Sequence, residues 1–143
     1  MKNIAIGCDH AGYELKKFIK NFLNSAGYNV IDKGTNSLDS VDYPDFAHQV
    51  AEEVANNKVE FGVLICGSAN GVSISANKHK DVRAAIAWIP EIAALAKQHN
   101  NANILSLPAR YISESEAKSI VEAYLEADFE GGRHQRRVEK INC

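Results

Sequence analysis

Short runs of apolar, β-prone residues alternate along this chain with segments whose apolar residues recur at helical spacing. The β-prone runs fall at residues 4–8, 29–32, 63–66, 84–87 and 104–107. This alternation is typical of βαβ units, in which a helix connects two parallel strands by a right-handed crossover. The sequence therefore predicts an α/β fold with helices on both faces of a five-stranded parallel sheet, in the strand order 2-1-3-4-5.

The helices are marked by apolar spacing and by residues that favour helix ends. Pro44 and Pro90 are each suited to the first turn of a helix, and Ser113 with Glu116 forms a capping box. Helices are expected over 15–23, 45–57, 91–98, 113–125 and 132–141.

Length and charge limit what the chain can be. At 143 residues and 45% hydrophobic, it is long enough for one domain with a full core, and we expect a single domain over 1–143. The formal net charge of −2 gives no basic excess for nucleic acid or a membrane surface, although 133–140 is locally positive. We expect neither partner, only a small anion, and no run is long enough to cross a membrane. A soluble, cytoplasmic protein is expected.

The cysteines point the same way. Cys8, Cys66 and Cys143 are an odd and sparse set without the spacing of metal ligands. They predict reduced thiols rather than a disulfide framework, and no metal site is expected.

The most informative motif is Cys66 at the end of an apolar strand, followed by a glycine-rich turn that reaches Gly71. Ligands bind at the carboxyl ends of parallel strands, and a turn that enters a helix offers unpaired amide donors to negative charge. A thiol is only a few per cent ionised at neutral pH, so it needs such help to act as a base. The alternative is a buried cysteine that only fills space.

The first and third strands are expected to lie at the point where the strand order reverses. Their ends would then bring Asp9 and His10 beside Cys66. Segment 9–12 has neither the dinucleotide nor the triphosphate loop pattern, so the ligand should be smaller than a nucleotide. Alternatively, Asp9 is a plain helix cap and His10 an exposed loop residue.

Two other groups could carry chemistry. Arg133 and Arg137 lie four residues apart on the predicted last helix, an arrangement suited to a phosphate. Their alternative is a solvated face paired with Glu130 and Glu139. His99 closes the fourth main helix, and we expect it near the carboxyl edge of the sheet, where it could exchange protons. A cation that stabilises a helix C-terminus is its other interpretation.

A series of motifs then occurs in a fixed order. They are Gly7-Cys-Asp-His-Ala-Gly12, Asp42-Tyr-Pro44, Leu64-Ile-Cys-Gly-Ser68, Ala76-Asn-Lys78, Gln98-His-Asn100 and Gly131-Gly-Arg-His-Gln-Arg-Arg137. With them the chain resembles type B ribose-5-phosphate isomerases, of the ribose/galactose isomerase family, over almost every residue. The resemblance implies a flavodoxin-like three-layer αβα sandwich and a homodimer with active sites between the subunits. Whether dimers pair further stays open.

The activity implied by the resemblance is metal-free interconversion of D-ribose 5-phosphate and D-ribulose 5-phosphate through an enediolate, without a cofactor, in the pentose phosphate pathway. Cys66 would move a proton between C2 and C1, His99 would help open the sugar ring, and Ser68 would belong to the catalytic turn. The other implied roles are enediolate binding for Gly67, Ser68, Ala69, Asn70 and Gly71, sugar contacts for Asp9, His10, Tyr43 and Asn100, and further ligand binding for Arg110, Arg133 and Arg137, the last two chiefly for phosphate.

One residue departs from the family pattern. Ala69 stands where the family commonly has glycine, and alanine there costs about 1 kcal/mol if the backbone is left-handed. The anion pocket would otherwise differ slightly from the family's usual form.

Two rival functions remain. A six-carbon substrate such as allose or galactose 6-phosphate is compatible with the same scaffold and deprotonation chemistry. A catalytically silent sugar-phosphate sensor is the alternative from a different class.

Overall fold

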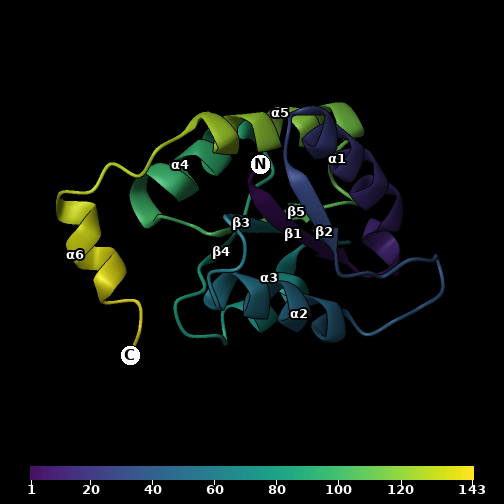
Figure 1. Ribbon diagram of the computed structural model, residues 1–143, viewed down its shortest axis with the longest axis horizontal. Helices are drawn as coiled ribbons and strands as arrows, with labels where there is room; N and C mark the ends of the chain where they lie inside the picture. Colours follow the sequence, from purple (N-terminus) through teal and green to yellow (C-terminus); the bar gives the residue numbers. More distant parts are fainter.

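A single parallel sheet forms the middle layer of the structure, a computed structural model that describes residues 1–143 (Figure 1). Its strands are β1 (Asn3–Cys8), β2 (Asn29–Asp32), β3 (Phe61–Cys66), β4 (Ala84–Ile86) and β5 (Ile104–Pro108). All neighbouring strands pair in parallel. The predicted α/β class and five-stranded parallel sheet are therefore confirmed.

A helical segment follows each strand, and the five expected helices are present. The helical segments are the short 3-10 turn η1 (His10–Gly12), α1 (Tyr13–Ser25), α2 (Tyr43–Ala55), α3 (Asn70–Ala76), α4 (Pro90–Asn100), α5 (Glu114–Glu126) and α6 (Arg133–Glu139). The short helix α3 is not among the predicted ranges. The predicted capping box is present, because the Glu116 N–H donates to Ser113 Oγ at 3.0 Å and the Ser113 N–H donates to the Glu116 carboxylate at 2.9 Å. The last helix is shorter at both ends than the predicted 132–141.

The predicted strand order is wrong in its last two positions. The observed order is β2-β1-β3-β5-β4, with β5 between β3 and β4. All residues of β5 are buried, whereas the three residues of β4 are only half-buried. The longer strand β5, buried along its whole length, takes the interior position, although it carries one buried polar residue, Ser106. The short, half-exposed strand β4 takes the edge.

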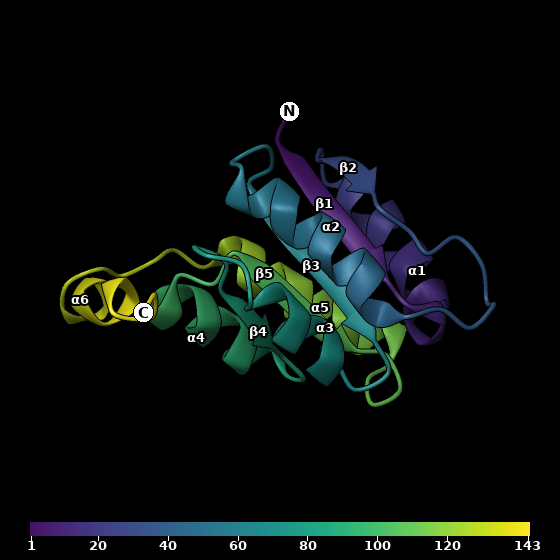
Figure 2. The same cartoon turned by 90° about the horizontal axis from the view of Figure 1, so that it is seen from below.

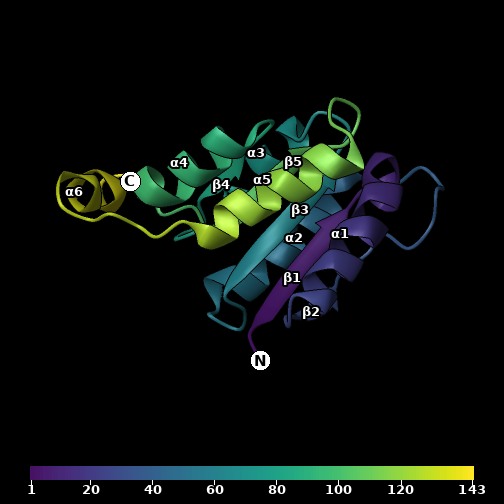
Figure 3. The ribbon, with the colours of Figure 1, turned by 90° about the horizontal axis from the view of Figure 1, so that it is seen from above.

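Alternate residues of the strands face opposite sides of the sheet. Val63 and Ile65 of β3 pack in a core with α1, α4 and α5, which cover one face (Figure 3). Leu64 and Cys66 pack in a second core with α2 and α3, which cover the other face (Figure 2). The three-layer αβα arrangement follows. None of the helices combines the length and the apolar character that a membrane span needs.

Helix α6 differs from the other helices because it has no buried residue. It projects beyond α4, at the end of the chain and away from the sheet (Figures 1 and 2). A helix of seven residues is not stable by itself in water, so α6 needs a surface to pack on.

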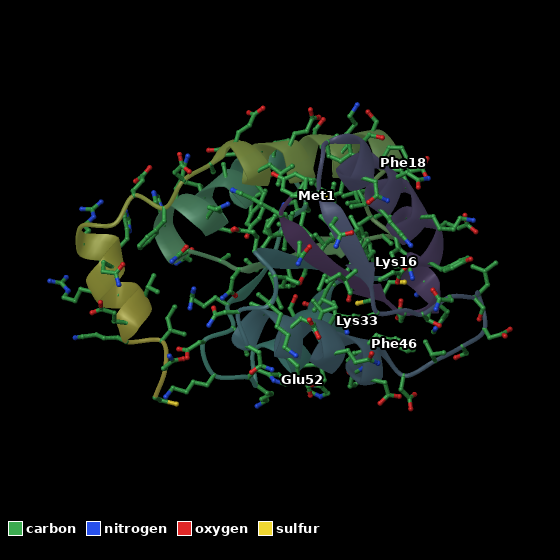
Figure 4. All side chains as sticks on the ribbon, viewed as in Figure 1. Met1, Lys16, Phe18, Lys33, Phe46 and Glu52 are labelled. Carbon is green, nitrogen blue, oxygen red and sulfur yellow. The ribbon has the colours of Figure 1, made fainter.

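The buried ammonium group of Lys16 anchors the segment that follows β2 (Figure 4). Lys16, only 1% exposed, projects from α1 and donates to Asp32 Oδ1 at 2.8 Å and to the Thr35 carbonyl. Burial alone would raise the pKa of the Asp32 carboxyl, but the hydrogen bonds from Lys16 and the Gly34 N–H outweigh it and hold that pKa below its ordinary value. Lys16 thus fixes the start of the long connection to α2.

We expect Lys16→Met to lower the free energy of unfolding by about 3 kcal/mol, because it leaves a partly buried carboxylate without its main partner. Lys20, 3.3 Å from Asp32, keeps the loss at the low end of the range for such pairs. Urea denaturation with Lys17→Met, on the exposed side of α1, as the control measures the effect. A loss no larger than that of the control would contradict the anchoring role.

The same pair predicts a pH dependence. Because the folded-state pKa of Asp32 is lowered, its contribution to stability is complete above the unfolded value of about 4 and is lost as the pH falls through the folded value. Lys16→Met should therefore reduce the acid sensitivity of the unfolding free energy between neutral pH and acidic pH. An unchanged acid dependence would mean that Lys16 does not set this pKa.

Candidate active site

A cavity of about 300 Å³ opens at the carboxyl edge of the sheet, beside the end of β3. Residues from the ends of β1 and β3, from the first turns of α2 and α3 and from the loop after β5 line it. They are Asp9, His10, Ala11, Tyr43, Cys66, Gly67, Ser68, Gly71, Arg110 and Tyr111. The first and third strands do bring Asp9 and His10 to the same cavity as Cys66.

Backbone hydrogen bonds fix the three segments around this cavity. The Asp9 N–H donates to the Ile65 carbonyl at 3.2 Å and joins the end of β1 to β3. On the other side of β3, the Arg110 N–H donates to the Gly67 carbonyl at 3.1 Å. Arg110 reaches the cavity because β5, and not β4, pairs with β3.

The Cys66 side chain is both a core residue and a cavity residue. It is 5% exposed and packs with residues of α2 and α3, yet it also lines the cavity beside Asp9 and Arg110. A cysteine that only fills space would not line a hollow surrounded by polar side chains. The structure therefore favours access of a small molecule to this sulfur.

The turn after Cys66 presents free backbone donors. The N–H groups of Gly67, Ser68, Ala69 and Gly71 make no hydrogen bond within the chain, and the Asn70 N–H bonds only to Ser68 Oγ, at 3.3 Å. The first helical backbone bond of α3 runs from the Ser73 N–H to the Ala69 carbonyl. A group of unpaired amides beside a thiol can stabilise negative charge on a bound oxygen.

Ala69 has the left-handed backbone that the family's usual glycine would adopt freely. Its φ is +68° and its side chain is fully buried in the core formed with α2 and α3. The left-handed conformation costs about 1 kcal/mol for alanine, and burial of the methyl group returns a similar amount. Alanine is therefore compatible with the turn.

Asp9 and His10 are held by their own backbone surroundings. Asp9 Oδ1 accepts from the N–H groups of Ala11 and Gly12, at 3.0 and 3.2 Å, so the helix-cap interpretation of Asp9 is correct for that oxygen. His10 Nδ1 accepts from the Val41 N–H at 3.3 Å, which leaves Nε2 as the nitrogen that carries the proton in a neutral ring.

Tyr43 closes one side of the cavity at the start of α2. A β-carbon built on Gly71 would lie 2.4 Å from the Tyr43 ring, so only glycine allows this contact. The ring is 41% exposed and is available to a ligand.

The structure does not place His99 where the sequence predicts it. His99 lies in the last turn of α4, which connects the parallel strands β4 and β5 and must return the chain to the amino edge of the sheet. Accordingly, the carbonyl of Asn103, a few residues after His99, accepts from the N–H of Gly62, which lies near the start of β3. The end of α4 is therefore near the amino edge of the sheet. The expectation of a carboxyl-edge position is wrong, because it ignored the direction of the helix.

Within one chain, the predicted site residues therefore form two groups. Neither His99 nor Asn100 lines the cavity at Cys66, and the same is true of Arg133 and Arg137. Asn100 instead lines a separate hollow of about 510 Å³ between residues 77–85 and the C-terminal end. That hollow shares no residue with the first one and contains no glycine-rich turn, so the smaller cavity is the candidate active site.

His99 has unexpected neighbours. Its ring stacks on that of His134, with centroids 4.3 Å apart, and the Nε2 atoms of both rings lie within 4 Å of Glu130 Oε1. Loss of hydration, with the nearby charges of His99 and Arg133, lowers the pKa of His134. Sequence reasoning gave His134 no role and missed Tyr111 in the cavity, because both placements depend on how distant segments pack.

The comparisons with known proteins agree with this geometry. The model of the Ribose/Galactose Isomerase family matches residues 4–141, and the chain belongs to this family. A ribose-5-phosphate isomerase B of Escherichia coli is 50% identical over 143 residues, which is 100% of this chain and 96% of that protein.

Solved structures are equally similar. A ribose 5-phosphate isomerase of Thermotoga maritima has a TM-score of 0.97 at 48% identity and covers 99% of this chain and 97% of its own. The isomerase B of Mycoplasma genitalium, solved with bound ribulose-5-phosphate, has a TM-score of 0.94 at 50% identity and covers 97% of this chain and 93% of its own.

The three thiols should differ in reactivity towards iodoacetamide. Cys143 is exposed and should be alkylated first, and Cys66 should follow through the cavity. Cys8 is fully buried, and burial raises its pKa to about 12, so it should react only after unfolding. Peptide mass spectrometry over time measures the order. Native labelling of Cys8 together with Cys143, or no native labelling of Cys66, would contradict this packing.

Proposed function

We propose that this protein interconverts D-ribose 5-phosphate and D-ribulose 5-phosphate. The observation that carries the proposal is the Cys66 thiol beside the unpaired amides of the turn that follows it. The proposal is supported by the family and by the similar M. genitalium enzyme with bound ribulose-5-phosphate.

The chemistry follows from the two parts of this site. As a thiolate, Cys66 removes the proton from C2 of the open-chain aldose, and the electron pair moves to form an enediolate. The resulting thiol returns the proton to C1, and the hydroxyl proton passes from O2 to O1 as the C2 carbonyl forms, which gives the ketose. No oxidant, metal or cofactor is required. Free amides of the turn stabilise the enediolate oxygen, and loss of one such donor typically costs about 3 kcal/mol.

The sugar must be opened before this step, and His99 is our proposed acid–base group for opening. Because His99 lies near the amino edge and Cys66 at the carboxyl edge of the same sheet, one chain does not bring them together. We therefore propose a homodimer in which each cavity receives His99, Asn100, Arg133 and Arg137 from the second subunit. The two arginines would bind the phosphate by paired hydrogen bonds.

The surface of the chain supports this dimer. β4 is an edge strand, and Ile74, Trp88 and Ile89 are large exposed apolar residues on the neighbouring α3 and on the segment from β4 to α4. Such residues beside an open sheet edge are typical of an interface. The unpacked helix α6 would gain its missing contact surface on the second subunit. A cytoplasmic location and a place in the pentose phosphate pathway stay predictions.

Cys66→Ala should abolish turnover of ribose 5-phosphate while the protein remains folded, because alanine fits the same partly apolar wall. Cys143→Ala, which removes an exposed thiol, is the matched control and should keep full activity. Ribulose 5-phosphate formation and circular dichroism measure the two properties. Equal activity of Cys66→Ala and the wild type would remove the base from the proposal.

Co-expression of Cys66→Ala with His99→Asn tests the shared site. If each site takes one residue from each subunit, half of the dimers are mixed, each has one intact site, and activity returns to about a quarter of the wild type. Cys66→Ala with Arg110→Ala is the matched control, since both residues lie in the same cavity and no intact site is formed. Equal activity of both mixtures would contradict a site shared between subunits.

A substrate panel separates the rival functions. We expect a higher kcat/KM for ribose 5-phosphate than for allose or galactose 6-phosphate. A preference for a hexose phosphate would move the function to the six-carbon branch of the family's chemistry. Tight binding without turnover of any sugar phosphate would indicate a sensor.

A further inference from the structure

Two imidazoles and a carboxylate converge where the end of α4 meets the start of α6. His99 Nε2 lies 3.7 Å and His134 Nε2 3.8 Å from Glu130 Oε1. The rings are stacked, with 11° between their planes, and both Nε2 atoms lie beside the same carboxylate oxygen. One ligand atom from each residue lies within 4.8 Å of the other two.

The backbone, and not only the side-chain rotamers, sets this approach. The Glu130 N–H donates to the Gln98 carbonyl at 3.0 Å, which holds Glu130 beside the residue that precedes His99. Gly131 and Gly132 have φ of +66° and +59° and turn the chain back, and the His134 N–H donates to the Gly131 carbonyl at 3.0 Å. Glycine is the residue that adopts such positive φ values most readily, so it is favoured at both positions.

The donor set matches one class of ligand. Two imidazoles and one carboxylate with an open fourth position are a common arrangement around zinc, whereas magnesium and calcium prefer oxygen donors. At zinc–ligand distances near 2.1 Å, tetrahedral ligand atoms are about 3.3 Å apart. The two His–Glu distances of 3.7 and 3.8 Å need to shrink by only a few tenths of an ångström. The stacked rings must also turn, so that the lone pairs of both nitrogens point to one ion. Both His99 and Glu130 are partly exposed and free to make this adjustment.

We propose that His99, Glu130 and His134 bind a divalent transition-metal ion of the zinc type, and that the bound ion inhibits the enzyme. The inhibition rests on the proposed function, because the ion would occupy His99 Nε2 and remove the group that opens the sugar ring. Arg133 and Arg137 add positive charge next to the site, so binding should be weaker than in a closed four-ligand structural site.

Binding is tested first without activity. Co²⁺ is added to the full-length Cys66→Ala/Cys143→Ala protein, which removes the two accessible thiols, and the visible absorption reports bound ion. We expect one equivalent per chain, displaced by Zn²⁺ and not by Mg²⁺. Glu130→Gln and His134→Ala should each weaken binding roughly tenfold or more. The matched control is His48→Asn, because His48 and His79 form the other close histidine pair and should not contribute.

Inhibition is then measured with Zn²⁺ in the protein with native cysteines. Glu130→Gln should raise the half-inhibiting Zn²⁺ concentration roughly tenfold, with the inhibition of each protein expressed relative to its own turnover without metal. Unchanged Co²⁺ binding in both Glu130→Gln and His134→Ala would overturn the site. Inhibition that is equal in Glu130→Gln and the wild type would overturn its regulatory role and indicate capture of a thiol. A protein without turnover would defeat the proposed function but leave the binding result intact.

Discussion

The pairing of β3 with β1 on one side and β5 on the other is the interaction on which the candidate site depends. It brings Asp9, Cys66 and Arg110 to one edge of the sheet, although they are far apart in the sequence. These three strands are buried on both faces, so the register between them is strongly specified. A slip of β3 by one residue would turn Cys66 to the opposite face of the sheet. The Cys66 sulfur is therefore positioned by the hydrophobic packing of the whole core.

Much of this arrangement could be predicted from the sequence because it depends on local patterns. Apolar spacing predicts the strands and helices, and the reversal of strand order next to β1 predicts the meeting of Asp9 with Cys66. The positions of β4 and β5 depend on how two similar short strands compete for an interior place, and periodicity carries no information on that competition. The full burial of β5 decides it, and Arg110 enters the cavity as a result.

The predicted position of His99 is wrong for a different reason. A helix that connects parallel strands begins at the carboxyl edge and ends at the amino edge, so a residue in its last turn lies opposite the ends of the strands. The direction of the helix is not written in the motifs themselves, although the family resemblance implies active sites between two subunits. The separation of His99 from Cys66 favours two chains, and the exposed apolar residues near β4 supply an independent reason for association.

The exposure of His99 explains why a group suited to ring opening is also suited to binding a metal. A histidine that exchanges protons with a sugar must be partly exposed and keep a free nitrogen, and His99 meets both conditions beside Glu130 and His134. Deep burial would exclude metal ions but also the substrate. In a dimer, a phosphate between Arg133 and Arg137 would bring negative charge close to this cluster and substrate close to His99. Substrate and a zinc-type ion would then compete for one imidazole, while the thiol and the amide turn at Cys66 stay unchanged.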